Sequence, residues 1–97
     1  GGLAGNLIRV IPEGCTAVLD RSQWHEGPIF TLMRQLGVPD DEMDATFNLG
    51  LGMVLVVPED SAAAVQADLE SAGETCYRLG HVQAGGHEVI IQGDPQA

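Results

Sequence analysis

The amino-acid sequence predicts an α+β fold, in which a mixed β-sheet carries helices packed on one face. Segments with apolar residues at helical spacing alternate with short apolar segments of strand length along the 97 residues. Near the end of the chain, two strand-like segments flank the turn Ala84–Gly86, which is typical of a β-hairpin. The expected order of elements is α-β-α-α-β-α-β-β, within one small domain.

Composition narrows the class of protein. The chain has 44% hydrophobic residues, fourteen acidic residues, four arginines and no lysine, for a net charge of −10. Such a chain is not expected to bind nucleic acid or anionic membranes, which attract clustered positive charge. No apolar run approaches the roughly 20 residues that cross a bilayer, and no signal peptide is recognisable. Cys15 and Cys76 are too few for a disulfide scaffold, so we expect reduced thiols and a cytoplasmic protein.

The first twelve residues predict a short helix that is entered through glycines and ended by Pro12. Leu3 and Leu7 recur at helical spacing, and Asn6 and Arg9 lie three apart on one face. This segment has a basic residue and no acid, and a glycine-rich helix start presents N–H groups to an anion. It is therefore the expected place for a phosphate. The alternative is a tight turn followed by a solvent-facing arginine.

The next elements are a strand and two helices. Cys15–Asp20 predicts a short strand, and Arg21–Gly27 predicts a loop. Pro28 suits the first position of a helix that Gly37 ends. Asp40 is expected to cap a second short helix, whose first turn is acidic as the helix dipole prefers. These acids do not have the spacing of a calcium-binding loop, since other residues occupy the positions that need glycine and glutamate.

The stretch Thr46–Pro58 is expected to organise the domain. A polar loop that contains Asn48, Gly50 and Gly52 leads into Met53–Val57, five consecutive apolar residues. Such a run predicts a strand that is buried on both faces, so the core is expected to begin where the loop ends. Glycines at this junction let the backbone approach a ligand closely; the alternative is that they only turn a corner.

The remaining chain predicts one helix and the terminal hairpin. The helix starts at Pro58–Ser61 and is closed by Gly73. The hairpin strands are Cys76–Val82 and His87–Gln92, and Gly93–Ala97 is a frayed tail.

The sequence contains no self-contained catalytic constellation. The lack of lysine excludes a P-loop and a Schiff-base lysine within the chain. The pair Gly50-x-Gly52 precedes a predicted strand, whereas a dinucleotide fingerprint follows a strand and opens a helix. The histidines and cysteines have no metal-ligand spacing. If the protein is an enzyme, much of its active site is expected to lie elsewhere.

An ordered set of motifs resembles the C-terminal domain of phosphoribosylformylglycinamidine cyclo-ligase, also called aminoimidazole ribonucleotide (AIR) synthetase. The motifs are GGLxxNxxRVxPEG at the start, Trp24…Pro28-Ile29-Phe30, and Glu42-Met43…Thr46-Phe47-Asn48-x-Gly50-x-Gly52-Met53. They run in order over nearly all 97 residues. The chain departs from the family's usual Pro, Met and Ile at Ile8, Leu49 and Leu51, which are apolar exchanges.

This resemblance implies a place in purine biosynthesis. The family converts formylglycinamidine ribonucleotide to aminoimidazole ribonucleotide, driven by ATP and magnesium. Residues 1–97 resemble the later part of its C-terminal domain, which closes the substrate cleft. The family's ATP-binding N-terminal domain, which also forms the dimer, is expected to lie outside the sequence. The expected partners are the ribonucleotide, the ATP-binding domain and a second copy of the protein. Residues 1–97 alone are expected to be inactive and to bind neither ATP nor magnesium.

The resemblance also implies a substrate site on two segments. Main-chain amides of both segments are expected to contact the phosphate or ribose, with Asn6 adding a side-chain hydrogen bond. Arg9 either joins them or holds the helix in place. No residue of the chain is expected to be catalytic. The expected substrate-binding residues are Gly1, Gly2, Leu3, Asn6, Arg9, Asn48, Gly50 and Gly52.

Two alternatives belong to other classes of protein. A stand-alone module that binds a small molecule would fit the length, the charge and the lack of catalytic groups. A dimerisation domain would fit a sheet whose exposed edge pairs with another copy.

Overall fold

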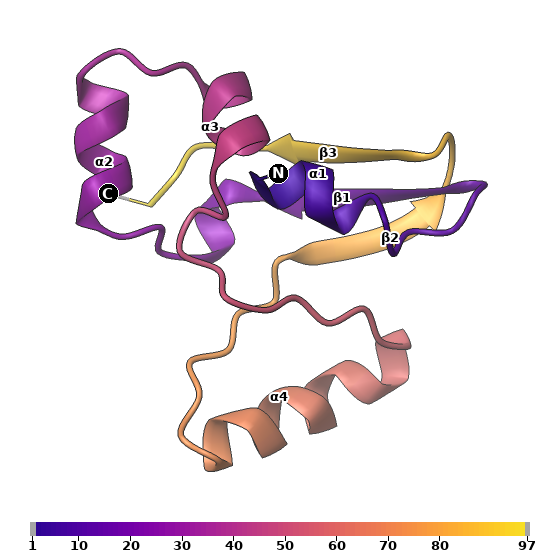
Figure 1. The fold of residues 1–97 in the computed structure, drawn as a ribbon. Helices are drawn as coiled ribbons and strands as arrows, with labels where there is room; N and C mark the ends of the chain where they lie inside the picture. The colour runs from indigo at the N-terminus through magenta and orange to yellow at the C-terminus, as the bar shows by residue number, and fades with distance from the viewer. Residues whose placement is uncertain (1, 97) are drawn as a thin grey trace.

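The computed structural model describes residues 2–96 and confirms the α+β class with a mixed sheet (Figure 1). Its elements follow in the order α1 (Gly2–Leu7), β1 (Cys15–Asp20), η1 (Arg21–Gln23), α2 (Pro28–Gln35), α3 (Asp40–Thr46), η2 (Glu59–Ser61), α4 (Ala62–Ser71), β2 (Gly80–Ala84) and β3 (Glu88–Gln92). In Figure 1, α1 lies beside α3 and the sheet, whereas α4 stands apart from the sheet. Within residues 2–96, no helix is long and apolar enough to cross a membrane.

The predicted strand Cys15–Asp20 is confirmed and becomes the central strand, β1. It pairs antiparallel with β2 and parallel with β3, so the strand order is β2-β1-β3. Ala17 lies opposite Val82 on one side and Val89 on the other. Directly opposed residues share a face of a sheet, so these three apolar side chains point to the same side.

The last two strands do not form the predicted hairpin. They flank β1, and their short connection crosses the end of that strand. The Gly85 amide donates to the Gly14 carbonyl at 2.9 Å, and the Thr16 hydroxyl donates to the Gly86 carbonyl at 2.5 Å. These bonds join the β2–β3 connection to the start of β1. Strand β1 therefore lies between β2 and β3, which do not pair with each other.

The prediction of a central strand at Met53–Val57 is also wrong. The segment is irregular, and the Met53 side chain is 83% exposed. Both sides of β1 are already occupied by β2 and β3, and within residues 2–96 the segment pairs with neither outer edge of the sheet. An apolar run becomes a buried strand only where a partner strand is available to satisfy its backbone.

The core lies in the first half of the chain, not after the Asn48 loop as predicted. Every buried residue among residues 2–96 precedes Gly50. The buried apolar cluster consists of Leu3, Leu7, Ile11, Ala17, Leu19, Trp24, Met43 and Leu49. The face of the sheet that carries Ala17 therefore packs mainly against α1, α3 and the loops that join them to β1.

The first helix is shorter than predicted, since α1 ends at Leu7 and the chain turns before Pro12. The imidazole of His87, which precedes β3, lies against this turn. Its Nε2 atom is 2.9 Å from the Ile11 carbonyl oxygen and 3.2 Å from that of Ile8. The turn is thereby joined to the start of β3 across more than seventy residues of sequence.

The boundaries of the later elements are partly as predicted. Pro28 begins α2 and Asp40 begins α3, as expected. The Asp40 side chain does not cap α3 but pairs with Arg34. Strand β2 begins at Gly80 instead of Cys76, because the preceding residues are irregular.

Candidate functional site

The two segments predicted to bind substrate lie side by side, although 42 residues separate them in sequence. The Leu3 amide in the first turn of α1 donates to the Phe47 carbonyl at 2.9 Å. One helical turn further on, Asn6 Nδ2 donates to Asn48 Oδ1 at 3.4 Å. Both asparagine side chains are exposed. The structure thus places two neutral amide side chains together at the surface where α1 meets the end of α3.

Gly2 and Leu3 serve mainly to seat α1 on α3. Gly2 is buried with φ +74°, and a Cβ atom there would lie 2.5 Å from the Asp44 carbonyl oxygen. Only glycine fits so close a backbone contact with a positive φ. The Leu3 side chain is buried, and its amide is engaged by the Phe47 carbonyl. Gly1 lies outside the described residues.

Arg9 is exposed in the turn that follows α1. It lies three residues after Asn6 and is the basic residue nearest to the asparagine pair in sequence. Arg21 and Arg34, by contrast, are engaged in ion pairs inside the domain.

Asn48 is the first residue of a tight turn. The Leu51 amide donates to the Asn48 carbonyl at 3.1 Å, and the two central residues, Leu49 and Gly50, have φ values of +58° and +83°. Positive φ at both central positions defines a type I′ turn, in which a leucine at the first central position is unusual. The leucine is stabilised there by its fully buried side chain and by Trp24, whose Nε1–H donates to the Leu49 carbonyl at 3.1 Å.

The two glycines of this loop have different environments. A Cβ atom on Gly50 would lie 2.5 Å from the Glu26 carbonyl oxygen, so this glycine allows close packing of two loops. A Cβ atom on Gly52 would have nothing within 4 Å. Gly50 is therefore required by the fold, whereas Gly52 is an exposed residue at the start of the irregular segment.

A network of ion pairs behind the loop was not expected from the sequence. Arg21 forms a two-pronged pair with Asp44, and Arg34 forms one with Glu26, with N–O distances of 3.0 and 2.7 Å. Asp40 pairs with Arg34. The hydrogen bonds that Arg21 donates to Asp44 and Arg34 donates to Glu26, more than the accompanying charge interactions, raise the pKa values of both arginines above the ordinary value.

The network has a consequence for the candidate site. Because Arg21 neutralises Asp44, the end of α3 next to the asparagine pair presents little net negative charge. A lone tryptophan in a segment predicted as a loop was the one sequence signal that pointed to this region, because large aromatic side chains are usually buried anchors.

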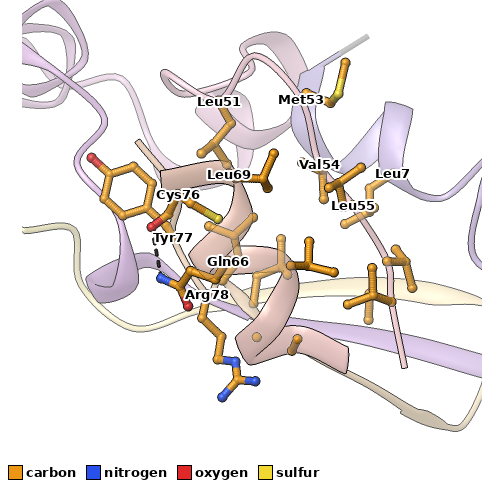
Figure 2. Close-up of a pocket in the computed structure, with 18 of the residues that line it drawn as sticks. Leu7, Leu51, Met53, Val54, Leu55, Gln66, Leu69, Cys76, Tyr77 and Arg78 are labelled. Carbon is orange, nitrogen blue, oxygen red and sulfur yellow. Dashed lines mark hydrogen bonds between the residues drawn. The ribbon is translucent and has the colours of Figure 1, made fainter. Parts of the chain in front are cut away.

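A broad apolar groove of about 1140 Å³ lies next to the same loop. Figure 2 shows side chains of the 51–57 segment around it, among them Leu51, Val54 and Leu55, with Leu69 of α4 between Leu51 and the other two in this view. Gln66 of α4 donates to the Cys76 carbonyl at 3.2 Å, which ties the helix to the chain that leads into β2.

Within residues 2–96, no group of three or more His, Cys, Asp or Glu side chains is arranged to hold a metal ion. The candidate site is built from amide side chains, main-chain groups and an exposed arginine, which are hydrogen-bonding groups that do not transfer protons at neutral pH.

A three-stranded mixed sheet, with helix α1 and the Asn48 loop brought together from distant parts of the sequence, defines a small α+β domain. The chain belongs to the family of the AIR synthase related protein, C-terminal domain, whose model matches residues 1–93. This finding confirms the resemblance drawn from the motifs.

Named relatives of the chain are cyclo-ligases. It is 51% identical over 96 residues to the phosphoribosylformylglycinamidine cyclo-ligase of Symbiobacterium thermophilum, covering 95% of this chain and 27% of that protein. It is 40% identical over 94 residues to the enzyme of the same name from Brevibacillus brevis, covering 96% and 27%. It is 42% identical over 95 residues to the enzyme of the same name from Myxococcus xanthus, covering 97% of this chain and 28% of that protein. The chain thus spans about a quarter of the length of these curated relatives.

Proposed function

We propose that the chain forms part of the substrate cleft of a phosphoribosylformylglycinamidine cyclo-ligase, which converts formylglycinamidine ribonucleotide to aminoimidazole ribonucleotide. Membership of the family and the names of the relatives support this reaction. The single structural observation that carries the proposal is the pairing of Asn6 and Asn48 at the surface.

The asparagine pair has the hydrogen-bonding groups that a ribonucleotide needs. Its N–O distance of 3.4 Å exceeds the usual range of N–H···O bonds, so the bond is weak and easily exchanged for a ligand. The two Asn48 Nδ2 hydrogens can donate to phosphate oxygens, and the Asn6 carbonyl oxygen can accept from a ribose hydroxyl. Neutral amides suit an anionic ligand in a chain whose net charge is −10, because carboxylates would repel it.

The surrounding charges favour the same ligand. The acid nearest to this surface on α3, Asp44, is neutralised by Arg21, and Arg9 adds an exposed positive charge one turn beyond Asn6. We assign Arg9 to the approach of the anion, since an exposed guanidinium acts mainly through its charge.

The remaining requirements of the reaction are assigned to the rest of the enzyme. We propose that ATP and magnesium bind outside residues 1–97, that the full-length protein is a cytoplasmic homodimer, and that residues 1–97 alone do not turn over substrate. The absence of lysine supports this division, since it excludes a P-loop for ATP within residues 1–97.

The test is calorimetric titration of the full-length enzyme with formylglycinamidine ribonucleotide and, separately, with ATP. Asn6→Ala and Asn48→Ala are each expected to raise the Kd of the ribonucleotide about 10-fold, as expected for loss of a hydrogen bond to a charged group. The Kd of ATP is expected to stay unchanged in both variants.

Gln35→Ala is the matched control, because it removes an exposed amide from the far end of α2. It should leave both Kd values unchanged. If Asn6→Ala and Asn48→Ala bind the ribonucleotide as tightly as the unmodified enzyme, the asparagine pair is not part of the cleft. If they weaken ATP instead, the proposed division between the two ligands is wrong.

A further inference from the structure

The turn that carries Asn48 has a backbone conformation that its own sequence disfavours. Leu49 has φ +58°, and a non-glycine residue in this left-handed region costs about 1–2 kcal/mol. A turn with positive φ at both central positions normally uses asparagine or glycine at the first of them. Something outside the turn must therefore compensate for the leucine.

Trp24 supplies that compensation. Its side chain is 0% exposed, and its Nε1–H donates to the Leu49 carbonyl at 3.1 Å. The bond joins the indole to the peptide group between the two left-handed residues. The Leu49 side chain is also 0% exposed. Leu49 is therefore fixed in two ways, by the burial of its side chain and by the hydrogen bond to its carbonyl.

The segment around Trp24 is itself held rigidly against the turn. Arg21, at its start, pairs with Asp44 of α3 at 2.5 Å. Glu26, at its end, has its backbone against Gly50 and its carboxylate on Arg34 at 2.7 Å. The indole is therefore fixed at both ends of the segment that bears it.

We propose that Trp24 is a positioning residue for substrate binding, which acts by holding the Asn48–Leu51 turn so that the Asn48 amide faces Asn6. The inference rests on the proposed function, since it assigns Trp24 an effect that is exerted through Asn48. Trp24 itself is fully buried, so its effect on a surface ligand is exerted through the turn. Without the indole bond, the turn is free to relax Leu49 to negative φ, which turns the Asn48 side chain away from α1.

The experiment is a double-mutant cycle in the full-length enzyme, with Trp24→Phe, Asn48→Ala and their combination. Trp24→Phe keeps an aromatic ring but loses the N–H donor. It is expected to raise KM for formylglycinamidine ribonucleotide about 3- to 10-fold at nearly unchanged kcat, the range for one lost hydrogen bond. In the Asn48→Ala background, the same substitution is expected to change KM by less than about 2-fold, because the Asn48 side chain through which Trp24 acts is absent.

Two further variants separate positioning from general loss of stability. Benzothienylalanine at position 24 keeps the shape of the indole and replaces N–H by sulfur, so it should fold normally and still raise KM. Leu19→Ala removes a buried side chain of β1 that takes no part in the Trp24–Leu49 hydrogen bond, and its KM is expected to stay unchanged below its unfolding temperature.

The outcomes distinguish this inference from the proposed function. If Asn48→Ala raises KM but Trp24→Phe and the benzothienylalanine variant do not, the inference is overturned and the proposed cleft stands. Equal KM increases for Trp24→Phe with and without Asn48, or an increase for Leu19→Ala of the same size, also overturn the inference. If Asn48→Ala itself leaves KM unchanged, the proposed function fails and the inference fails with it.

Discussion

Arg21 and Asp44 form a two-pronged ion pair in which both N–O distances are 2.5 Å. The Arg21 side chain is 4% exposed and that of Asp44 is 15% exposed. The pair joins the turn after β1 to the last residues of α3, directly beneath the point where α1 meets the Asn48 loop. An arginine that looked like a surface loop residue in the sequence is therefore one of the most buried charges of the domain.

Arg21→Ala is expected to lower the free energy of unfolding by about 3–5 kcal/mol, because it leaves a carboxylate without its partner in a buried site. Arg21→Lys should recover only part of this loss, since an ammonium cannot make the two-pronged bond. The measurement is urea denaturation followed by circular dichroism. Arg78→Ala, at an exposed arginine, is the control and should change stability by less than about 0.5 kcal/mol. A loss below 1 kcal/mol for Arg21→Ala would show that the pair is solvated.

The pKa of Asp20 is lowered from its ordinary value of 3.8 by the hydrogen bond from the Ser22 hydroxyl and then by that from the Ser22 amide. These bonds measure 2.7 and 2.9 Å. A lowered folded-state pKa stabilises the fold above the unfolded pKa, and this contribution is lost as the pH falls through the folded pKa.

Ser22→Ala should therefore raise the Asp20 pKa toward 3.8, as measured by NMR titration of the carboxyl carbon. The variant should also show a shallower loss of stability on acidification below that pH. Ser61→Ala, at a serine far from Asp20, is the control and should leave the titration unchanged. An unshifted Asp20 titration in Ser22→Ala would mean that the bond from the Ser22 hydroxyl does not persist in solution.

Gly50 and Gly52 offer a matched pair of substitutions in one loop. Gly50→Ala is expected to destabilise the protein by about 2–3 kcal/mol, because φ is +83° and the new Cβ would collide with the Glu26 carbonyl. Gly52→Ala meets nothing within 4 Å and should be neutral or slightly stabilising. Thermal unfolding of both variants checks this order, and equal losses would contradict the described turn.

Side-chain truncations before and after residue 50 should differ strongly in their effect on the free energy of unfolding. Leu7→Ala removes a side chain that is 5% exposed and is expected to cost about 3–5 kcal/mol. Leu55→Ala removes one that is 52% exposed, in the segment that lines the groove, and should cost about 1 kcal/mol or less. Chemical denaturation of the two variants is the measurement. A large loss for Leu55→Ala would show that the 53–57 segment packs more tightly in solution.

The local elements were predictable because their signals are local. Pro28 at the start of α2, the apolar strand Cys15–Asp20 and the glycine entry to α1 depend on residues within a few positions of each other. The pairing of strands depends on residues far apart, and there the prediction failed. The turn Ala84–Gly86 favours a hairpin, but the start of β1 lies between its two strands, a position that only the tertiary fold determines.

The candidate site was predictable to a similar extent. Asn6 and Asn48 were identified from motifs, and the structure adds that they touch. The roles of Trp24, Arg21 and Asp44 behind them were not predicted, because Trp24 and Arg21 were assigned to a loop and Asp44 lies in the acidic helix that follows. No local pattern shows that a tryptophan will bond to a carbonyl 25 residues later.

The way β2 and β3 enclose β1 also bears on how the chain is made. During synthesis, residues 15–20 emerge more than sixty residues before either of their neighbours in the sheet. For that interval β1 exposes two unsatisfied edges, the kind of surface on which nascent chains associate. Its pairings are also distant in sequence, which slows folding because a long loop must close first. A ribosome-bound chain of this protein is thus expected to depend on protection of β1 until residues 80–92, which form both neighbouring strands, have emerged.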